Sequence, residues 1–181
     1  MSVTLFSQQH IDFQKQVHDE CPAYGNASLV FAPMVSELCN ANVIQSLLDY
    51  GAGEGQVPQN LELDHDMDVQ LYDPAIKRLQ DSPNPAEMVI CLDVLDAVEI
   101  DCIDAVLDDL KSLTTKMAFF AINTMQPESM QGTEIDDSGR EFQPMEWWLP
   151  KLMERFELHY LSRISTGFVV VLKAQNRASV Q

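Results

Sequence analysis

The sequence SLLDYGAGEG, residues 46–55, decides the fold expected of this chain. Its first half is an apolar run that ends at Asp49, which is typical of a buried strand. Its second half carries glycine at every second position, Gly51, Gly53 and Gly55, and glycine accepts positive φ angles without steric cost. A ligand can therefore rest directly on main-chain N–H groups at such a turn. The stretch predicts a buried strand that runs into a ligand-binding glycine turn.

The spacing of these glycines distinguishes the turn from a dinucleotide site. The dinucleotide pattern G-x-G-x-x-G places a pyrophosphate at a helix N-terminus, whereas residues 49–55 read D-x-G-x-G-x-G. The carboxylate of Asp49 would repel a pyrophosphate and attract an ammonium group. The segment resembles motif I of the class I S-adenosylmethionine-dependent methyltransferases. That resemblance implies that the turn passes beneath the methionine part of the cofactor, while acidic residues hold its amino group and ribose.

The composition is that of an acidic globular chain. Its 181 residues are 46% hydrophobic and 22% charged, which fits one domain with a sizeable core. With 11 basic and 28 acidic residues the net charge is −17, so a nucleic-acid substrate is disfavoured. No apolar run approaches the ~20 residues of a membrane span and no signal peptide is evident, so we expect a cytoplasmic protein. The four cysteines are scattered without ligand or disulfide spacing, and we expect no metal site.

Acidic or amide side chains recur where the predicted strands end. Strands are expected over residues 43–49, 68–74, 87–92 and 116–123, and at their ends lie Asp49, Asp73, Asp93 and Asn123. Asp73 follows Asp49 by 24 residues, about the separation at which nucleotide-binding folds place the carboxylate that binds ribose hydroxyls. Ligands of parallel sheets bind at the carboxyl ends of the strands. The four side chains therefore predict one site.

The other elements predict an α/β fold. Helices are expected over residues 7–20, 28–39, 56–62, 100–113 and 145–156, and a C-terminal hairpin over residues 158–172. Strands that alternate with helices imply a mainly parallel sheet, to which the hairpin adds antiparallel strands. This order resembles the Rossmann-like sandwich of class I methyltransferases, with helices on both faces of the sheet.

We expect residues 1–181 to form a single methyltransferase-like domain. The expected parts are an N-terminal helical cap at 1–41, a cofactor-binding half at 42–123, a lid or substrate loop at 124–143, and a helix with the C-terminal hairpin at 144–181. In methyltransferases of this type, the N-terminal helices fold over the cofactor.

The resemblance also implies which residues bind the cofactor, S-adenosylmethionine, and its product S-adenosylhomocysteine. They are Asp49, Tyr50, Gly51, Ala52, Gly53 and Gly55 of the glycine turn, Asp73 and Pro74 after the second strand, and Leu92 and Asp93 after the third. Catalytic residues are not assigned, because methyl transfer mainly requires an acceptor held in line with the sulfonium. None of the four histidines, His10, His18, His65 and His159, lies at a predicted strand end.

Several segments are similar to a narrower branch, the small bacterial and phage methyltransferase-domain proteins. Among them are Tyr24-Gly25, Tyr72-Asp73-Pro74-Ala75 and Glu146-Trp147-Trp148. The chain departs from that branch at Glu54, where a lysine is usual, at Asp96-Ala97, where Glu-His is usual, and over residues 137–142, where a basic loop is usual. The cofactor side is kept and the presumed substrate side is altered.

The leading hypothesis is an S-adenosylmethionine-dependent methyltransferase with a small-molecule acceptor, since the motifs of base-modifying enzymes are missing from their expected places. The alternative is a catalytically degenerate protein of this fold that binds cofactor or a protein partner. An acidic mimic of nucleic acid and an NAD-dependent oxidoreductase are less favoured. An open cleft would support the enzyme, and a cleft filled by residues 124–143 would support the binding protein. The methyl acceptor and the oligomeric state stay open.

Overall fold

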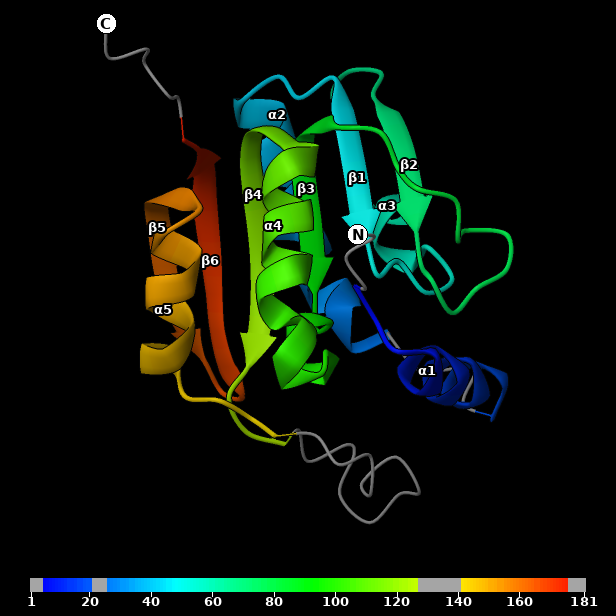
Figure 1. The fold of residues 1–181 in the computed structure, drawn as a ribbon. Helices are drawn as coiled ribbons and strands as arrows, with labels where there is room; N and C mark the ends of the chain where they lie inside the picture. Colours follow the sequence, from blue (N-terminus) through cyan, green and yellow to red (C-terminus); the bar gives the residue numbers. More distant parts are fainter. Residues whose placement is uncertain (1–4, 21–25, 127–140, 176–181) are drawn as a thin grey trace, which may run out of the picture.

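A computed structural model of the chain describes residues 5–20, 26–126 and 141–175. Its centre is a six-stranded sheet with the order β2-β1-β3-β4-β6-β5 (Figure 1). The parallel strands are β1 (Ser46–Tyr50), β2 (Asp68–Tyr72), β3 (Ala86–Leu92) and β4 (Thr114–Asn123). The strands β5 (Phe156–Ile164) and β6 (Gly167–Ala174) form a hairpin, and β6 pairs antiparallel with β4. The predicted mainly parallel sheet with an antiparallel C-terminal hairpin is confirmed.

Helices cover both faces of this sheet (Figure 1). On one face lie α4 (Ile103–Leu113) and α5 (Met145–Met153), and on the other lie α2 (Ala32–Ala41) and α3 (Gln56–Gln59). Strand β4 shows why the central strands are apolar throughout: Phe120 packs in the core beneath α4, and its neighbour Phe119 packs in the core beneath α2. Strands that are covered on both faces need apolar side chains at consecutive positions.

Several boundaries differ from the sequence prediction. Helices α3 and α5 end at Gln59 and Met153, before the predicted residues 62 and 156. Strand β1 begins at Ser46 rather than at Val43, because Val43 has a φ of 49° and belongs to the turn that closes α2. The second helix is divided into a 3-10 turn, η1 (Asn26–Phe31), and α2, whose first turn holds Pro33. The helix expected from residue 100 begins as a 3-10 turn, η3 (Ile100–Cys102), before α4, and a separate 3-10 turn, η2 (Leu95–Ala97), precedes it.

Helix α1 (Gln8–Glu20) lies beside the carboxyl ends of β1 and β2 rather than in either helical layer (Figure 1). The Ser7 hydroxyl accepts a hydrogen bond from the N–H of His10 at 3.0 Å, which caps the helix. The N–H of Ser7 donates to Glu99 Oε2 at 2.9 Å, and the Phe6 side chain is buried in the core beneath α4. The start of α1 is thereby fixed to the body of the fold.

Most of the loop predicted over residues 124–143 lies outside the described residues. Within the parts that the structure describes, the helices are too short or too polar for a membrane span.

Candidate functional site

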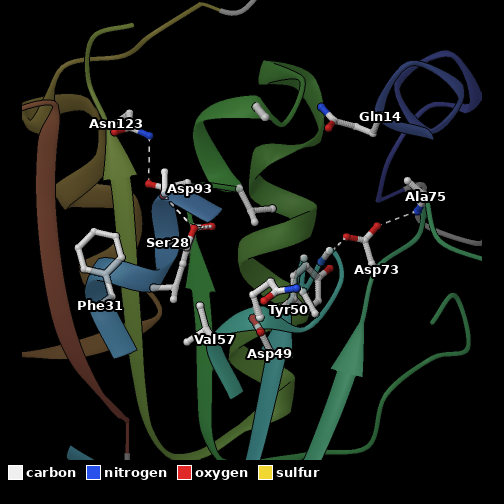
Figure 2. Close-up of a pocket in the computed structure, with 18 of the residues that line it drawn as sticks. Gln14, Ser28, Phe31, Asp49, Tyr50, Val57, Asp73, Ala75, Asp93 and Asn123 are labelled. Carbon is white, nitrogen blue, oxygen red and sulfur yellow. Dashed lines mark hydrogen bonds between the residues drawn. The ribbon is translucent and has the colours of Figure 1, made fainter. Parts of the chain in front are cut away.

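A cavity of about 950 Å³ opens at the carboxyl ends of the parallel strands. Figure 2 shows that its side chains come from the ends of β1, β2 and β3, from α1, and from the segment that contains η1. The four side chains that the sequence placed at strand ends, Asp49, Asp73, Asp93 and Asn123, all line it. The structure therefore brings the predicted cluster together.

The glycine turn forms the floor of this cavity. Gly51, Gly53 and Gly55 all have positive φ angles, 82°, 52° and 74°. The N–H groups of Gly51 and Ala52 both donate to the carbonyl of Tyr72, at 2.8 and 3.0 Å, which ties the turn to the end of β2. A left-handed backbone at three alternate positions is the conformation for which glycine is needed.

The three glycines serve different purposes. A Cβ on Gly51 would lie 2.4 Å from Val94 Cγ2, and a Cβ on Gly55 would lie 2.7 Å from Leu71 Cδ1, so both positions are closed by the protein itself. A Cβ on Gly53 would meet only His18 Cε1, at 3.4 Å. The space above Gly53 belongs to the cavity, and Gly53 is the glycine that leaves room for a ligand.

Two of the residues that the sequence assigned to cofactor binding, Gly55 and Tyr50, are placed differently from the others. Gly55 is not part of the described cavity lining; it begins α3 in the left-handed conformation. Tyr50 lines the cavity, but its ring packs on Tyr72 at 4.8 Å between centroids and its hydroxyl donates to Asp109 Oδ2 at 2.9 Å. Burial, followed by the Asp109 charge, raises the pKa of the Tyr50 phenol above its ordinary value. The Tyr50 side chain belongs to the core.

Replacing Tyr50 with phenylalanine should therefore affect folding and not ligand binding. The change removes one hydrogen bond to a charged group, and we expect a loss of about 1.5–3 kcal/mol in the free energy of unfolding. Urea unfolding followed by circular dichroism measures this loss. A tenfold weaker ligand affinity in the folded variant would instead place the Tyr50 hydroxyl in the site.

Asp73 connects the glycine turn to the segment after β2. Its Oδ2 accepts the N–H of Gly53 and its Oδ1 accepts the N–H of Ala75, both at 2.9 Å (Figure 2). The residue is 6% exposed. Each carboxylate oxygen has a further lone pair. Asp73 can therefore hold the turn in place and still accept hydrogen bonds from the hydroxyl groups of a ligand.

Asp93 is held at the end of β3 in an unusual conformation. Its φ is 59°, which is uncommon for a residue other than glycine and is typical of functional sites. Its carboxylate accepts hydrogen bonds from Ser28 Oγ at 2.9 Å and from Asn123 Nδ2 at 3.1 Å. The same Asn123 amide also approaches the buried Asp96 carboxylate at 3.4 Å. These contacts join the ends of β3 and β4 to η1.

Asp49 is the most deeply placed acid of the cavity wall, at 4% exposure. Burial in the first place, and the nearby Asp73 charge in the second, raise its pKa to about 7. A cationic group beside Asp49 would favour the ionised carboxylate and remove much of this effect. The position is therefore suited to a ligand that carries an ammonium group.

Helix α1 adds residues that the sequence did not place in the site. His10, Gln14 and His18 all line the cavity, and His18 Nε2 lies 3.9 Å from Asp73 Oδ2. They were missed because a helix reaches the site by packing, which no strand-end pattern reports. Their spacing of four residues, which places polar side chains on one helix face, is the signal that was present.

The site shows no built metal centre in the described parts of the chain, where groups of three or more suitable His, Cys, Asp or Glu side chains are not found.

Solved structures with a similar fold include methyltransferases. A 1,6-didemethyltoxoflavin-N1-methyltransferase from Burkholderia thailandensis, with bound 1,6-didemethyltoxoflavin and S-adenosylhomocysteine, matches with a TM-score of 0.64 at 15% identity, over 93% of this chain and 88% of that one. The N-methyltransferase NodS from Bradyrhizobium japonicum, in complex with S-adenosylhomocysteine, matches at 0.60 and 11% identity, over 92% and 97%. The 16S rRNA methylase ArmA matches at 0.55 and 11% identity, over 91% and 98%.

At the level of sequence, the chain matches no protein-family model and no curated protein. The sheet order, the antiparallel last strand and the helices on both faces agree with the solved structures. The chain therefore has the Rossmann-like fold of the S-adenosylmethionine-dependent methyltransferases.

Proposed function

We propose that the chain is an S-adenosylmethionine-dependent methyltransferase that acts on a small-molecule acceptor. The observation that carries the proposal is the glycine turn on the cavity floor, which Asp73 holds through the N–H of Gly53 at 2.9 Å. A turn with room above Gly53 and acids on either side fits a ligand that combines ribose hydroxyls with an ammonium group. S-adenosylmethionine has both, and when bound it supplies a methyl group on a positively charged sulfur.

Each acid at the site would hold a different part of this ligand. The carboxylate of Asp73 accepts two backbone N–H groups and keeps further lone pairs. With these lone pairs it would accept hydrogen bonds from the ribose hydroxyls. Asp49 would pair with the ammonium group, and the raised pKa of its carboxyl fits a position that binds a cation. Pro74 and Leu92 supply apolar wall, and Asp93, fixed by Ser28 and Asn123, borders the cavity beyond Leu92.

A small molecule is favoured over RNA as the acceptor. The fold itself serves both kinds of substrate, since the similar structures include an rRNA methylase. The net charge of −17 opposes the approach of a phosphate backbone. In addition, Asp96, which departs from the bacterial and phage branch, is buried against Asn123. The Asp96 carboxylate therefore helps to hold the site together and is not part of a surface for nucleic acid.

Calorimetric titration with S-adenosylmethionine and S-adenosylhomocysteine tests the proposal. We expect micromolar dissociation constants, which correspond to about −8 kcal/mol. NADH is the matched control, because it carries two ribose groups and a pyrophosphate but no amino acid, and Asp49 should exclude it. Tight binding of NADH without binding of either sulfur ligand would replace the methyltransferase with an oxidoreductase. An absence of all binding at millimolar ligand would contradict a cofactor site.

A further inference from the structure

One face of α1 carries polar side chains into the cavity. His10, Gln14 and His18 follow each other at intervals of four residues, so they lie along one side of the helix. Figure 2 shows Gln14, the middle one, pointing from α1 toward the cavity. Eight residues of helix separate the two imidazoles by about 12 Å along the axis. They therefore reach different ends of the cavity.

His18 lies at the cofactor end. Its Nε2 is 3.9 Å from Asp73 Oδ2, and its Cε1 is 3.4 Å from the position that a Cβ on Gly53 would occupy. A ligand whose ribose contacts Asp73 and whose chain crosses Gly53 would pass directly beneath this imidazole.

His10 lies about two turns of α1 away from His18, and its charge acts on the carboxylate of Glu99. Its ring stacks on Phe6 with 5.8 Å between centroids and 14° between planes. Glu99 Oε2 accepts the N–H of Ser7, three residues before His10, at 2.9 Å. Burial opposes ionisation of Glu99, but the Ser7 hydrogen bonds and the charge of His10 outweigh it, and the pKa of Glu99 lies below its ordinary value. A fixed carboxylate thus accompanies an imidazole that lines the cavity.

The three buried acids at the strand ends have other tasks: Asp49 is assigned to the ammonium group of the cofactor, and Asp73 and Asp93 hold neighbouring groups of the protein. Asp73 holds the N–H groups of Gly53 and Ala75, and Asp93 accepts hydrogen bonds from Ser28 and Asn123. An imidazole titrates near neutral pH, which suits a group that accepts a proton during catalysis. His10, about two turns of helix away from the cofactor end, is the wall residue best placed for that task.

We propose that His10 is the base that takes the proton of the methyl acceptor and that Glu99 positions it; this inference rests on the proposed function. The acceptor atom uses a lone pair to bond the methyl carbon while sulfur keeps the electron pair of the broken C–S bond. The acceptor's proton passes to a ring nitrogen of His10 and from there to solvent. The Glu99 carboxylate stabilises the imidazolium that forms. The acceptor is accordingly a molecule with an ionisable O–H or N–H group, seated in the cavity beside His10.

Acylation of the histidines with diethyl pyrocarbonate, followed residue by residue with mass spectrometry, tests this division of the cavity. The reagent attacks neutral imidazole, and His159, exposed on β5, serves as the internal control. At about ten times its dissociation constant, S-adenosylhomocysteine should slow the acylation of His18 about tenfold. The acylation of His10 should change by less than about twofold, because His10 lies beyond the ligand. Equal protection of both residues would overturn the proposal, since it would place His10 against the cofactor.

The variant Glu99→Gln tests the second half of the proposal. Glutamine keeps a side-chain oxygen for the N–H of Ser7, so α1 stays anchored while the charge is lost. The pH midpoint of His10 acylation should fall by about one unit, because an opposite charge no longer favours the imidazolium. An unchanged midpoint would show that Glu99 does not act on His10.

Calorimetry separates this inference from the proposed function. The variants His10→Gln and Glu99→Gln should bind S-adenosylhomocysteine within about twofold of the unmodified protein, as expected for sites that share no contacts. A tenfold loss in His10→Gln would assign His10 to cofactor binding and overturn its role as the base. If the unmodified protein itself binds no S-adenosylhomocysteine, the proposed function fails, and the inference about His10 fails with it.

Discussion

Replacing Gly53 with valine is expected to abolish cofactor binding in a protein that still folds. The N–H of Gly53 faces Asp73, and its open side faces His18 across the cavity. A branched side chain there would fill the space above the turn, and we expect the dissociation constant for S-adenosylhomocysteine to rise at least about a hundredfold, or 2.7 kcal/mol. The left-handed φ of 52° adds a folding cost of about 1–2 kcal/mol for a residue with a Cβ. Calorimetry measures the binding, and circular dichroism verifies the fold.

Gly51 supplies the matched control. A Cβ at Gly51 would collide with Val94 at 2.4 Å, so Gly51→Ala should lower the melting temperature more than Gly53→Ala does. Adding Val94→Ala should restore part of that loss, because it removes the colliding methyl groups. Undiminished ligand affinity in folded Gly53→Val would show that the ligand does not rest on the glycine turn.

The strand ends were predictable because they depend on local sequence. An apolar run that stops at an acid marks a buried strand and its carboxyl end, and Asp49, Asp73 and Asp93 were found in this way. Their convergence also followed, since parallel strands present their carboxyl ends at one edge of a sheet. The cavity formed by these residues could therefore be inferred from the sequence.

Which side chains point into the cavity was harder to infer, although the alternation of residues along a strand carried part of this information. Tyr50 follows Asp49 in β1, and successive residues of a strand point to opposite faces. An acid that faces the cavity therefore implies a tyrosine that faces away, which agrees with the contact between Tyr50 and Asp109. The difference between Gly51 and Gly53 carried no such signal, because it depends on Val94 and His18, which lie far from the turn in sequence.

The resemblance implied that the N-terminal helices fold over the cofactor, but it did not show which side chains of α1 line the cavity, for a physical reason. Its position depends on the burial of Phe6 and on the hydrogen bond between Ser7 and Glu99, a contact between residues 92 positions apart. No periodicity within α1 reports such a contact. Hence the sequence could predict the helix over residues 7–20 and the position of His10 and His18 on one of its faces, but not that this face lines the cavity.

Replacing Asp49 with asparagine should stabilise the free protein and weaken its binding of the cofactor. Burial and the charge of Asp73 raise the pKa of Asp49 from 3.8 to about 7. Because the folded state holds this proton more tightly than the unfolded chain does, the stability that the group contributes is fully present below about pH 4 and is lost as the pH rises to about 7. Asparagine has the same shape without the charge. At pH 8, we expect its free energy of unfolding to exceed that of the unmodified protein by up to about 4 kcal/mol.

Urea titrations at pH 5 and pH 8 measure this gain. Every other ionisable group is shared by the two proteins, so the difference between their stabilities isolates Asp49, and it should be larger at pH 8. A variant that is less stable than the unmodified protein at pH 8 would mean that the Asp49 carboxylate forms a favourable contact in the free state.

Binding should change in the opposite direction. Loss of one partner of a buried charge pair costs about 2–5 kcal/mol, so Asp49→Asn should bind S-adenosylhomocysteine about a hundredfold more weakly. In the unmodified protein the affinity should rise as the pH passes through about 7, because only the ionised carboxylate pairs with the ammonium group. 5′-Methylthioadenosine, which keeps the ribose and lacks the amino acid, is the matched ligand and should bind both proteins equally. If its affinity falls as far as that of S-adenosylhomocysteine, Asp49 acts on the shape of the turn and not on the amino group.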